Sequence, residues 1–80
     1  MTTRSASPGP EPDAEAAGYR QQLAQLRLDD TTLPRARYIQ AEQQAILRDT
    51  PYNQGCIRAT AEYVCALEAG AEAPEPEAGL

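Results

Sequence analysis

The sequence predicts a small all-α protein, either a three-helix bundle or a helical hairpin. Apolar residues recur at spacings of three and four in three successive segments, which is the period of a helix that buries one face. Capping and turn residues bound each segment, and the connections between segments are short, as in helical bundles. The 80 residues have room for one domain, expected over residues 13–70, with helices at about 13–28, 34–49 and 51–69.

The first helix is expected to begin at Asp13, a good N-cap residue, with Glu15 in the first turn, where negative charge is favourable. Spacings of 3–4–3 make one narrow apolar stripe, formed by Ala16, Tyr19, Leu23 and Leu26. Gly18 weakens a helix, so a start only near Tyr19 is an alternative. Residues 29–32, Asp-Asp-Thr-Thr, favour a turn and end the helix.

The second helix is expected to begin at Pro34, with Thr32 or Leu33 as its cap, because the first turn does not need the N–H group that proline lacks. One face of this helix carries Ala36, Ile39, Gln43, Ile46 and Leu47. The stripe is thin and partly polar. It is either a seam that faces a partner or a weak core face.

The third helix is expected to begin where Thr50 precedes Pro51, a pairing typical of a cap and first turn. Its apolar positions repeat at 4–3–4–4 spacing and are Tyr52, Cys56, Ala59, Tyr63 and Leu67. Gly70 is placed to end the helix in a left-handed conformation. A turn over residues 52–55, with the helix beginning at Gly55 or Cys56, is the alternative.

Both ends of the chain are expected to be disordered tails, because residues 1–12 are rich in Pro, Ser, Thr and Gly and residues 71–80 are rich in Pro and Glu. The net charge of −5 belongs to residues 1–18, which carry −2, and to residues 71–80, which carry −3, since residues 19–70 contain six Arg and six acidic residues. A general basic field for nucleic acid is therefore not expected.

The residue types restrict the chemistry. The chain has no His and no Lys, which excludes an imidazole base, a His metal ligand and a Schiff base. Cys56 and Cys65 lie nine residues apart, so one helix separates them by about 13.5 Å along its axis, beyond disulfide reach. Cys56 is predicted to be a buried apolar residue, and Cys65 to be exposed or to face a second copy of the chain. We expect no catalytic residue, no cofactor and no metal.

The chain is expected to be cytoplasmic. No apolar run approaches the ~20 residues of a membrane span, and the first residues contain no apolar segment typical of a secretory signal. Abundant Arg and Ala with no Lys favour a bacterial source with a high-GC genome. The motifs are too generic to indicate a family.

The leading functional hypothesis is a small helical protein–protein interaction module, such as an accessory or regulatory subunit, an antitoxin-like inhibitor or an adaptor. It would form a homodimer or dock onto a protein partner. The predicted partner-binding residues are Tyr19, Leu23, Leu26, Ile39, Ile46, Tyr63 and Leu67. Arg35 and Arg37, at the start of the second helix, are a candidate anion contact. The alternatives are a nucleic-acid-binding transcriptional regulator that uses the second helix, and a small enzyme or modification factor that acts on a peptide at a dimer interface.

Overall fold

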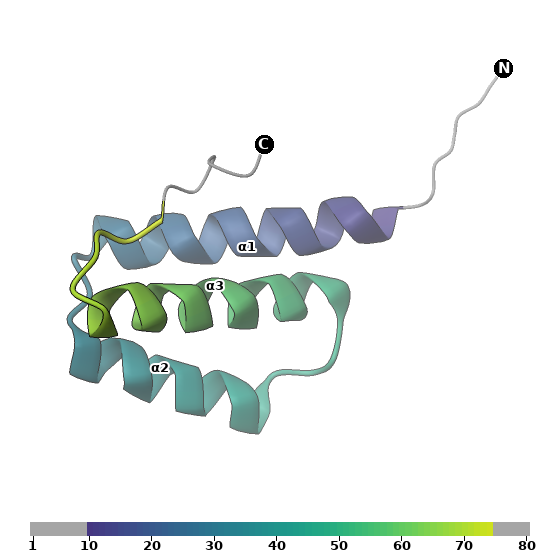
Figure 1. The fold of residues 1–80 in the computed structure, drawn as a ribbon. Helices are drawn as coiled ribbons and strands as arrows, with labels where there is room; N and C mark the ends of the chain where they lie inside the picture. Colours follow the sequence, from purple (N-terminus) through teal and green to yellow (C-terminus); the bar gives the residue numbers. More distant parts are fainter. Residues whose placement is uncertain (1–9, 75–80) are drawn as a thin grey trace, which may run out of the picture.

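The computed structural model describes residues 10–74, with the side chains of residues 14–74. It contains three helices, α1 (Pro10–Leu28), α2 (Leu33–Ile46) and α3 (Pro51–Glu68) (Figure 1). This confirms the predicted all-α class, and of the two predicted forms it is the three-helix bundle. The predicted tails at residues 1–9 and 75–80 lie outside the described residues.

Helix α3 is the central element of the bundle. It lies between α1 and α2 and packs against both, whereas α1 and α2 contact each other little (Figure 1). Helices α1 and α3 run in the same direction and α2 runs in the opposite direction. Helix α2 is therefore an edge element that depends on α3 for its support.

Two helix boundaries differ from the predicted ones. Helix α1 begins at Pro10, so residues 10–12 of the predicted N-terminal tail are helical; Pro10 and Pro12 suit a first turn, which needs no N–H groups. Helix α2 ends at Ile46 and not at residue 49. The connection to α3 is extended at Thr50, because a residue that precedes proline is disfavoured in the helical region.

The caps follow the sequence closely. The backbone N–H of Asn53 donates to the Thr50 side chain at 3.2 Å, so α3 begins at Pro51 as predicted and Gly55 lies inside the helix. Gly70 is left-handed, with φ 75°, as predicted. Helix α1 ends in the same way at Asp30, with φ 51°, a conformation that aspartate tolerates better than most residues.

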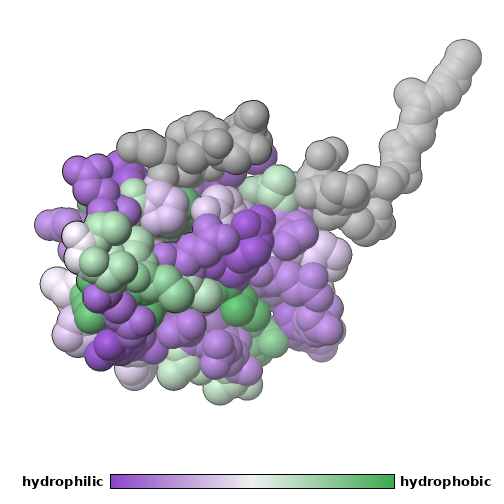
Figure 2. Space-filling view, in the orientation of Figure 1, coloured by the Kyte–Doolittle hydropathy of each residue, from purple (hydrophilic) through white to green (hydrophobic). Residues whose placement is uncertain are grey.

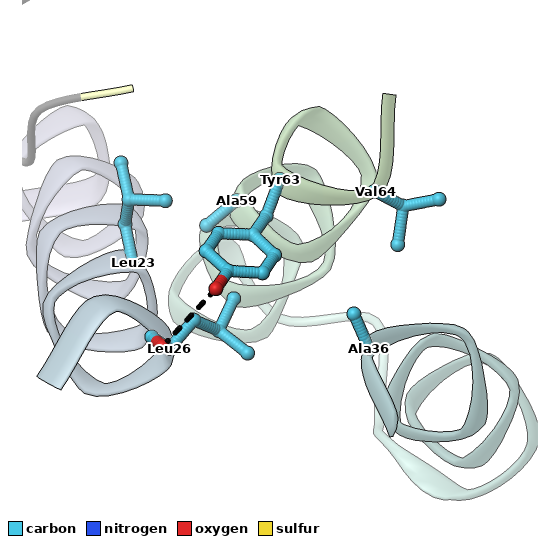
Figure 3. Close-up of a cluster of buried hydrophobic side chains, with 6 residues drawn as sticks. All are labelled: Leu23, Leu26, Ala36, Ala59, Tyr63 and Val64. Carbon is cyan, nitrogen blue, oxygen red and sulfur yellow. Dashed lines mark hydrogen bonds between the residues drawn. The ribbon is translucent and has the colours of Figure 1, made fainter. Parts of the chain in front are cut away.

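The core lies where the three helices meet (Figure 3). Its buried apolar side chains come from all three helices and are Leu23, Leu26, Ala36, Ala59, Tyr63 and Val64. Half-buried side chains surround it, namely Tyr19, Leu33, Ile39, Leu67 and Ala73. Tyr63 points its hydroxyl at the α1–α2 connection and donates to the carbonyl oxygen of Thr31 at 2.7 Å. A buried phenol thus holds the turn against α3.

The first residues of the predicted acidic tail contact the bundle. Beyond the left-handed Gly70, residues 71–74 return along the bundle, and Ala73 packs against the core. The Nη1 atom of Arg27 donates to the carbonyl oxygens of Ala73 at 2.9 Å and of Pro74 at 3.1 Å. These contacts with α1 place the segment, although its composition alone indicates a tail.

Candidate functional site

Helices α1 and α3 touch each other through their backbones at two glycines. A Cβ atom at Gly18 would overlap the carbonyl oxygen of Tyr52, and one at Gly55 would overlap the carbonyl oxygen of Glu15. The Sγ atom of Cys56 lies 3.5 Å from the carbonyl oxygen of Gly18 in the same contact. Both glycines thus allow the two backbones to approach closely. The sequence indicated only that a glycine weakens a helix, and did not reveal this contact.

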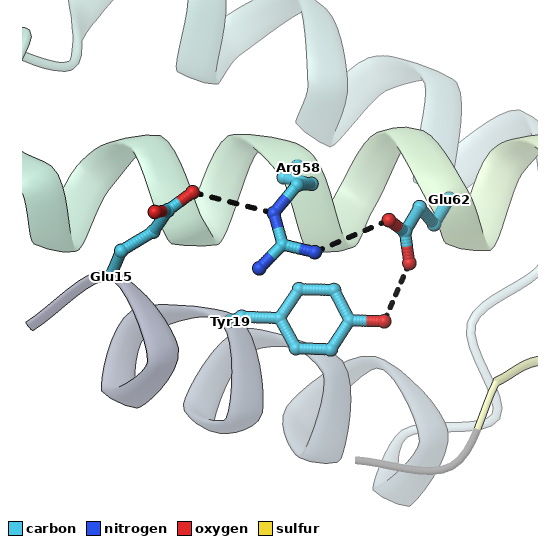
Figure 4. Close-up of polar contacts among 4 residues, drawn as sticks. All are labelled: Glu15, Tyr19, Arg58 and Glu62. Carbon is cyan, nitrogen blue, oxygen red and sulfur yellow. Dashed lines mark hydrogen bonds and ion pairs between the residues drawn. The ribbon is translucent and has the colours of Figure 1, made fainter. Parts of the chain in front are cut away.

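This close approach brings four polar side chains together in an α1–α3 polar cluster, formed by Glu15, Tyr19, Arg58 and Glu62 (Figure 4). The guanidinium of Arg58 lies over the Tyr19 ring, 4.2 Å from its centroid. Its nitrogens lie 3.4 Å from Glu15 and 3.3 Å from Glu62. Tyr19 donates its hydroxyl to Glu62 at 2.5 Å. Two residues of α1 are thereby tied to two residues of α3.

The polar cluster changes the acidity of its phenol. Burial and the hydrogen bond to Glu62 together raise the pKa of Tyr19 to about 12, because both disfavour the charged phenolate. Every member of the cluster contacts another member. The arrangement is a clamp between helices, in which exposed ion pairs contribute about 0.2–1 kcal/mol each and the cation–π contact a similar amount.

The two cysteines occupy different environments. Cys56 is buried, as predicted, and burial raises the pKa of its thiol, which therefore stays in its less reactive protonated form. Cys65 is exposed on α3. Among the described residues, no three His, Cys, Asp or Glu side chains gather closely enough to hold a metal ion.

An open hollow lies at the end of the bundle where α1 and α3 finish. Arg27, Asp30, Tyr63 and Leu67 line it together with residues 71–73, around a volume of about 320 Å³. Its rim carries both signs of charge, so it does not select a ligand by charge. Arg27 is also engaged by the returning segment.

The predicted anion contact is not assembled as one site. Arg37 forms an ion pair with Glu68 of α3 at 2.7 Å. Arg35 instead lies over the ring of Tyr38, 5.3 Å from its centroid. The two guanidinium groups therefore meet different partners on different sides of α2.

The structure divides the predicted partner-binding residues into three groups. Leu23, Leu26 and Tyr63 are buried in the core of the bundle. The half-buried members pack against that core and are Tyr19, Ile39 and Leu67. Only Ile46 of the set is largely exposed, at 73%. The stripes thus build the bundle itself, and most of their members have no free surface for a partner.

An exposed surface lies instead on the side of α2 that faces away from α3, and we name it the outer face of α2. Its exposed residues are Arg35, Tyr38, Ala41, Glu42, Ala45 and Ile46. Tyr38 is 55% exposed, although burial of an aromatic ring away from water is favourable. Its signal in the sequence was its place opposite Ala36 and Gln43 on the helix, which the sequence reading did not use.

Figure 2 shows that apolar residues form separate patches divided by hydrophilic residues on the face in view. The exposed large apolar residues agree with this, since they are spread over three helices as Leu28, Tyr38, Ile46 and Tyr52. On α2, Tyr38 and Ile46 lie on the same outer face. We therefore take the outer face of α2 as the candidate functional site.

Comparisons with protein-family models, with curated proteins and with solved structures find no match to this chain. No helix in the described part of the chain is both long and apolar enough to cross a membrane. The described residues define the class, a small all-α fold with three helices around one core.

Proposed function

We propose that this protein is a small helical protein–protein interaction module that binds its partner through the outer face of α2. One observation carries the proposal. Tyr38 and Ile46 are 55% and 73% exposed on the same side of a helix whose opposite side packs on α3. Burying an apolar side chain of this size contributes about 1.5–3 kcal/mol when burial is complete, so these two offer a partner a useful part of that amount.

The shape of this face suits a partner helix. Ala41 and Ala45 are exposed beside Tyr38 and Ile46, and such small side chains let a second helix come close while the larger ones fill its grooves. The charged residues Arg35 and Glu42 lie along the same face and would set the orientation of the partner. Roles of this kind include an accessory or regulatory subunit in the bacterial cytoplasm.

Site-specific photo-crosslinking tests the proposal. A photoreactive amino acid replaces Ala41 on the outer face of α2, and in a matched control it replaces Ala24, an exposed alanine of α1. Each variant is expressed at its natural level in cells of the source organism and irradiated. We expect discrete adducts of higher mass from position 41 and none from position 24. Equal labelling at both positions, or no adduct from position 41, would contradict the proposal.

A further inference from the structure

We propose that the partner on the outer face of α2 is a second copy of this chain, whose own α2 lies antiparallel to the first. This inference rests on the proposed function and names the partner. It starts from the charges of the outer face, because these decide which helix can lie on it and in which direction.

Arg35 and Glu42 are the two charges of this face. They lie seven residues apart, which is close to two helical turns and about 10.5 Å along the axis, so they share one side of α2. Among the described side chains of residues 14–74, the Glu42 carboxylate makes no hydrogen bond or ion pair, and the guanidinium of Arg35 contacts only the Tyr38 ring. One charge of each sign, without an ion-pair partner among the described residues, therefore lies on the same exposed side.

Two such helices are complementary only when they run in opposite directions. An antiparallel arrangement about a two-fold axis places Arg35 of each copy opposite Glu42 of the other, so the dimer contains two Arg35–Glu42 ion pairs. A parallel arrangement would place Arg35 against Arg35 and Glu42 against Glu42, and like charges in contact are unfavourable. The charge pattern thus selects a second copy in one orientation.

Two of the apolar residues, Tyr38 and Ala45, fit the same arrangement, whereas Ile46 lies opposite position 31, just before the other α2 begins. The two-fold axis passes between positions 38 and 39, so the two Tyr38 rings lie near the centre of the contact, where they leave water. Ala45, seven residues beyond Tyr38, then lies opposite position 32, at the start of the other α2, and its small side chain leaves room there. The contact is short because α2 has 14 residues, so we expect a reversible dimer that dissociates on dilution and weakens with salt.

Charge reversal and charge exchange test this inference in solution. Sedimentation equilibrium over a range of concentrations compares the wild-type chain with Arg35→Glu, Glu42→Arg and the double variant that carries both changes. Each single variant turns two attractions into two repulsions and is expected to raise the dimer dissociation constant at least about tenfold. The double variant restores the pairs with exchanged signs and is expected to return close to the wild-type value.

Two controls accompany the series. Arg48→Glu makes the same charge change in the connection between α2 and α3, outside the outer face, and is expected to leave the dissociation constant unchanged. All variants carry Cys65→Ser, which removes the exposed thiol as a source of covalent dimers. Circular dichroism should show unchanged helicity, because the reversed side chains are exposed.

The inference would be overturned by a chain that stays monomeric at every concentration. It would also be overturned by a dimer whose dissociation constant is the same in the wild type, both single variants and the double variant. Failure of this inference is distinct from failure of the proposed function. Crosslinked adducts from position 41 at twice the mass of the chain support the second copy. Adducts of another mass retain the interaction module and reject self-association, whereas the absence of adducts rejects both.

Discussion

At the scale of single residues, Tyr63 shows how one polar atom joins elements distant in sequence. Its ring lies in the core, and its hydroxyl donates to the Thr31 carbonyl oxygen in the α1–α2 connection. Thr31 is itself buried, and its own hydroxyl donates to the carbonyl oxygen of Leu26 at 3.0 Å. A buried carbonyl of a turn is costly without a donor, so the hydroxyl of Tyr63 compensates for the burial of the connection.

Tyr63→Phe removes this donor and keeps the ring. We expect the free energy of unfolding to fall by about 1–2 kcal/mol, because a buried carbonyl oxygen loses its hydrogen bond. Urea unfolding followed by circular dichroism measures the change. Tyr38→Phe is the matched control and should alter stability little, since Tyr38 is more than half exposed. Equal effects of the two changes would show that the hydroxyl of Tyr63 contributes nothing beyond the ring.

Tyr19 makes the stability of the fold depend on pH in the alkaline range. Burial and the hydrogen bond to Glu62 raise its pKa from 10.0 to about 12 in the folded chain. The folded state therefore keeps the phenol proton where the unfolded state has lost it. Its contribution to stability is complete below pH 10 and is lost as the pH rises from 10 towards 12. Burial raises the pKa of Tyr63 in the same direction.

Urea midpoints at pH 8 and pH 10.5 should therefore differ, with the lower midpoint at the higher pH. Tyr19→Phe should reduce this difference and leave the part that belongs to Tyr63. Phenolate absorbance during an alkaline titration provides the direct reading, because the variant loses one late transition. An unchanged pH dependence in Tyr19→Phe would mean that the pKa of Tyr19 is the same in the folded and unfolded chain.

At the scale of helices, the contact between α1 and α3 depends on two missing side chains. Gly18 and Gly55 each face a backbone carbonyl of the other helix, which allows the two axes to approach closely. The α1–α3 polar cluster (Figure 4) lies beside this contact, because Gly55 faces the backbone of two of its members, Glu15 and Tyr19. Intrinsic propensity disfavours glycine inside a helix, so the contact must compensate for that cost.

Gly18→Ala distinguishes helix propensity from backbone contact, because the two effects change the free energy of unfolding in opposite directions. Helix propensity alone would stabilise the chain by about 1 kcal/mol. The added methyl overlaps the Tyr52 carbonyl, however, and a core that is overfilled in this way loses typically about 1–3 kcal/mol or more. We therefore expect a net loss, measured by urea or thermal unfolding.

The control for this prediction is Ala24→Gly at an exposed position of α1, which measures propensity alone and should cost about 1 kcal/mol. Gly55→Ala should reproduce the loss seen with Gly18→Ala, because its Cβ would overlap the Glu15 carbonyl. If both alanine variants were more stable than the wild type, the helices would not be in backbone contact.

At the scale of the whole molecule, the small core and the central place of α3 set an order of local stability. Six side chains form the buried apolar cluster, and α3 contributes three of them while α2 contributes only Ala36. The inner face of α2 also buries Gln43, whose Oε1 atom has no hydrogen-bond partner among the described residues. Helix α2 therefore has the weakest attachment to the bundle.

Hydrogen exchange measured on the dilute chain should follow this order. Amides in the middle of α3 are expected to exchange most slowly, and those of α2 most quickly among the three helices, because local opening follows the number of buried contacts. At concentrations where the proposed dimer forms, protection in α2 should increase and that in α1 should change little. Uniform protection over all three helices would show instead that the bundle opens only as one unit.

The sequence by itself determined where the helices begin and end to within a few residues, because these signals are local. Thr50 with Pro51 starts α3, residues 29–32 end α1 and Gly70 ends α3, each through its own backbone preferences. Periodicity also identified Leu23, Leu26 and Tyr63 as members of the apolar stripes of their helices. For the candidate site, it singled out Ile46 and not Tyr38.

Only the tertiary structure decided what those stripes face. Periodicity shows that a face is apolar, but an intramolecular neighbour and a partner bury it equally well, so Leu23 and Tyr63 were assigned to a partner although they form the core. The same reason hid the pairing of Tyr19 with Arg58, which lie far apart in sequence and meet because the two glycines let α1 and α3 close. Contacts between helices depend on the relative placement of whole elements, which no local spacing contains.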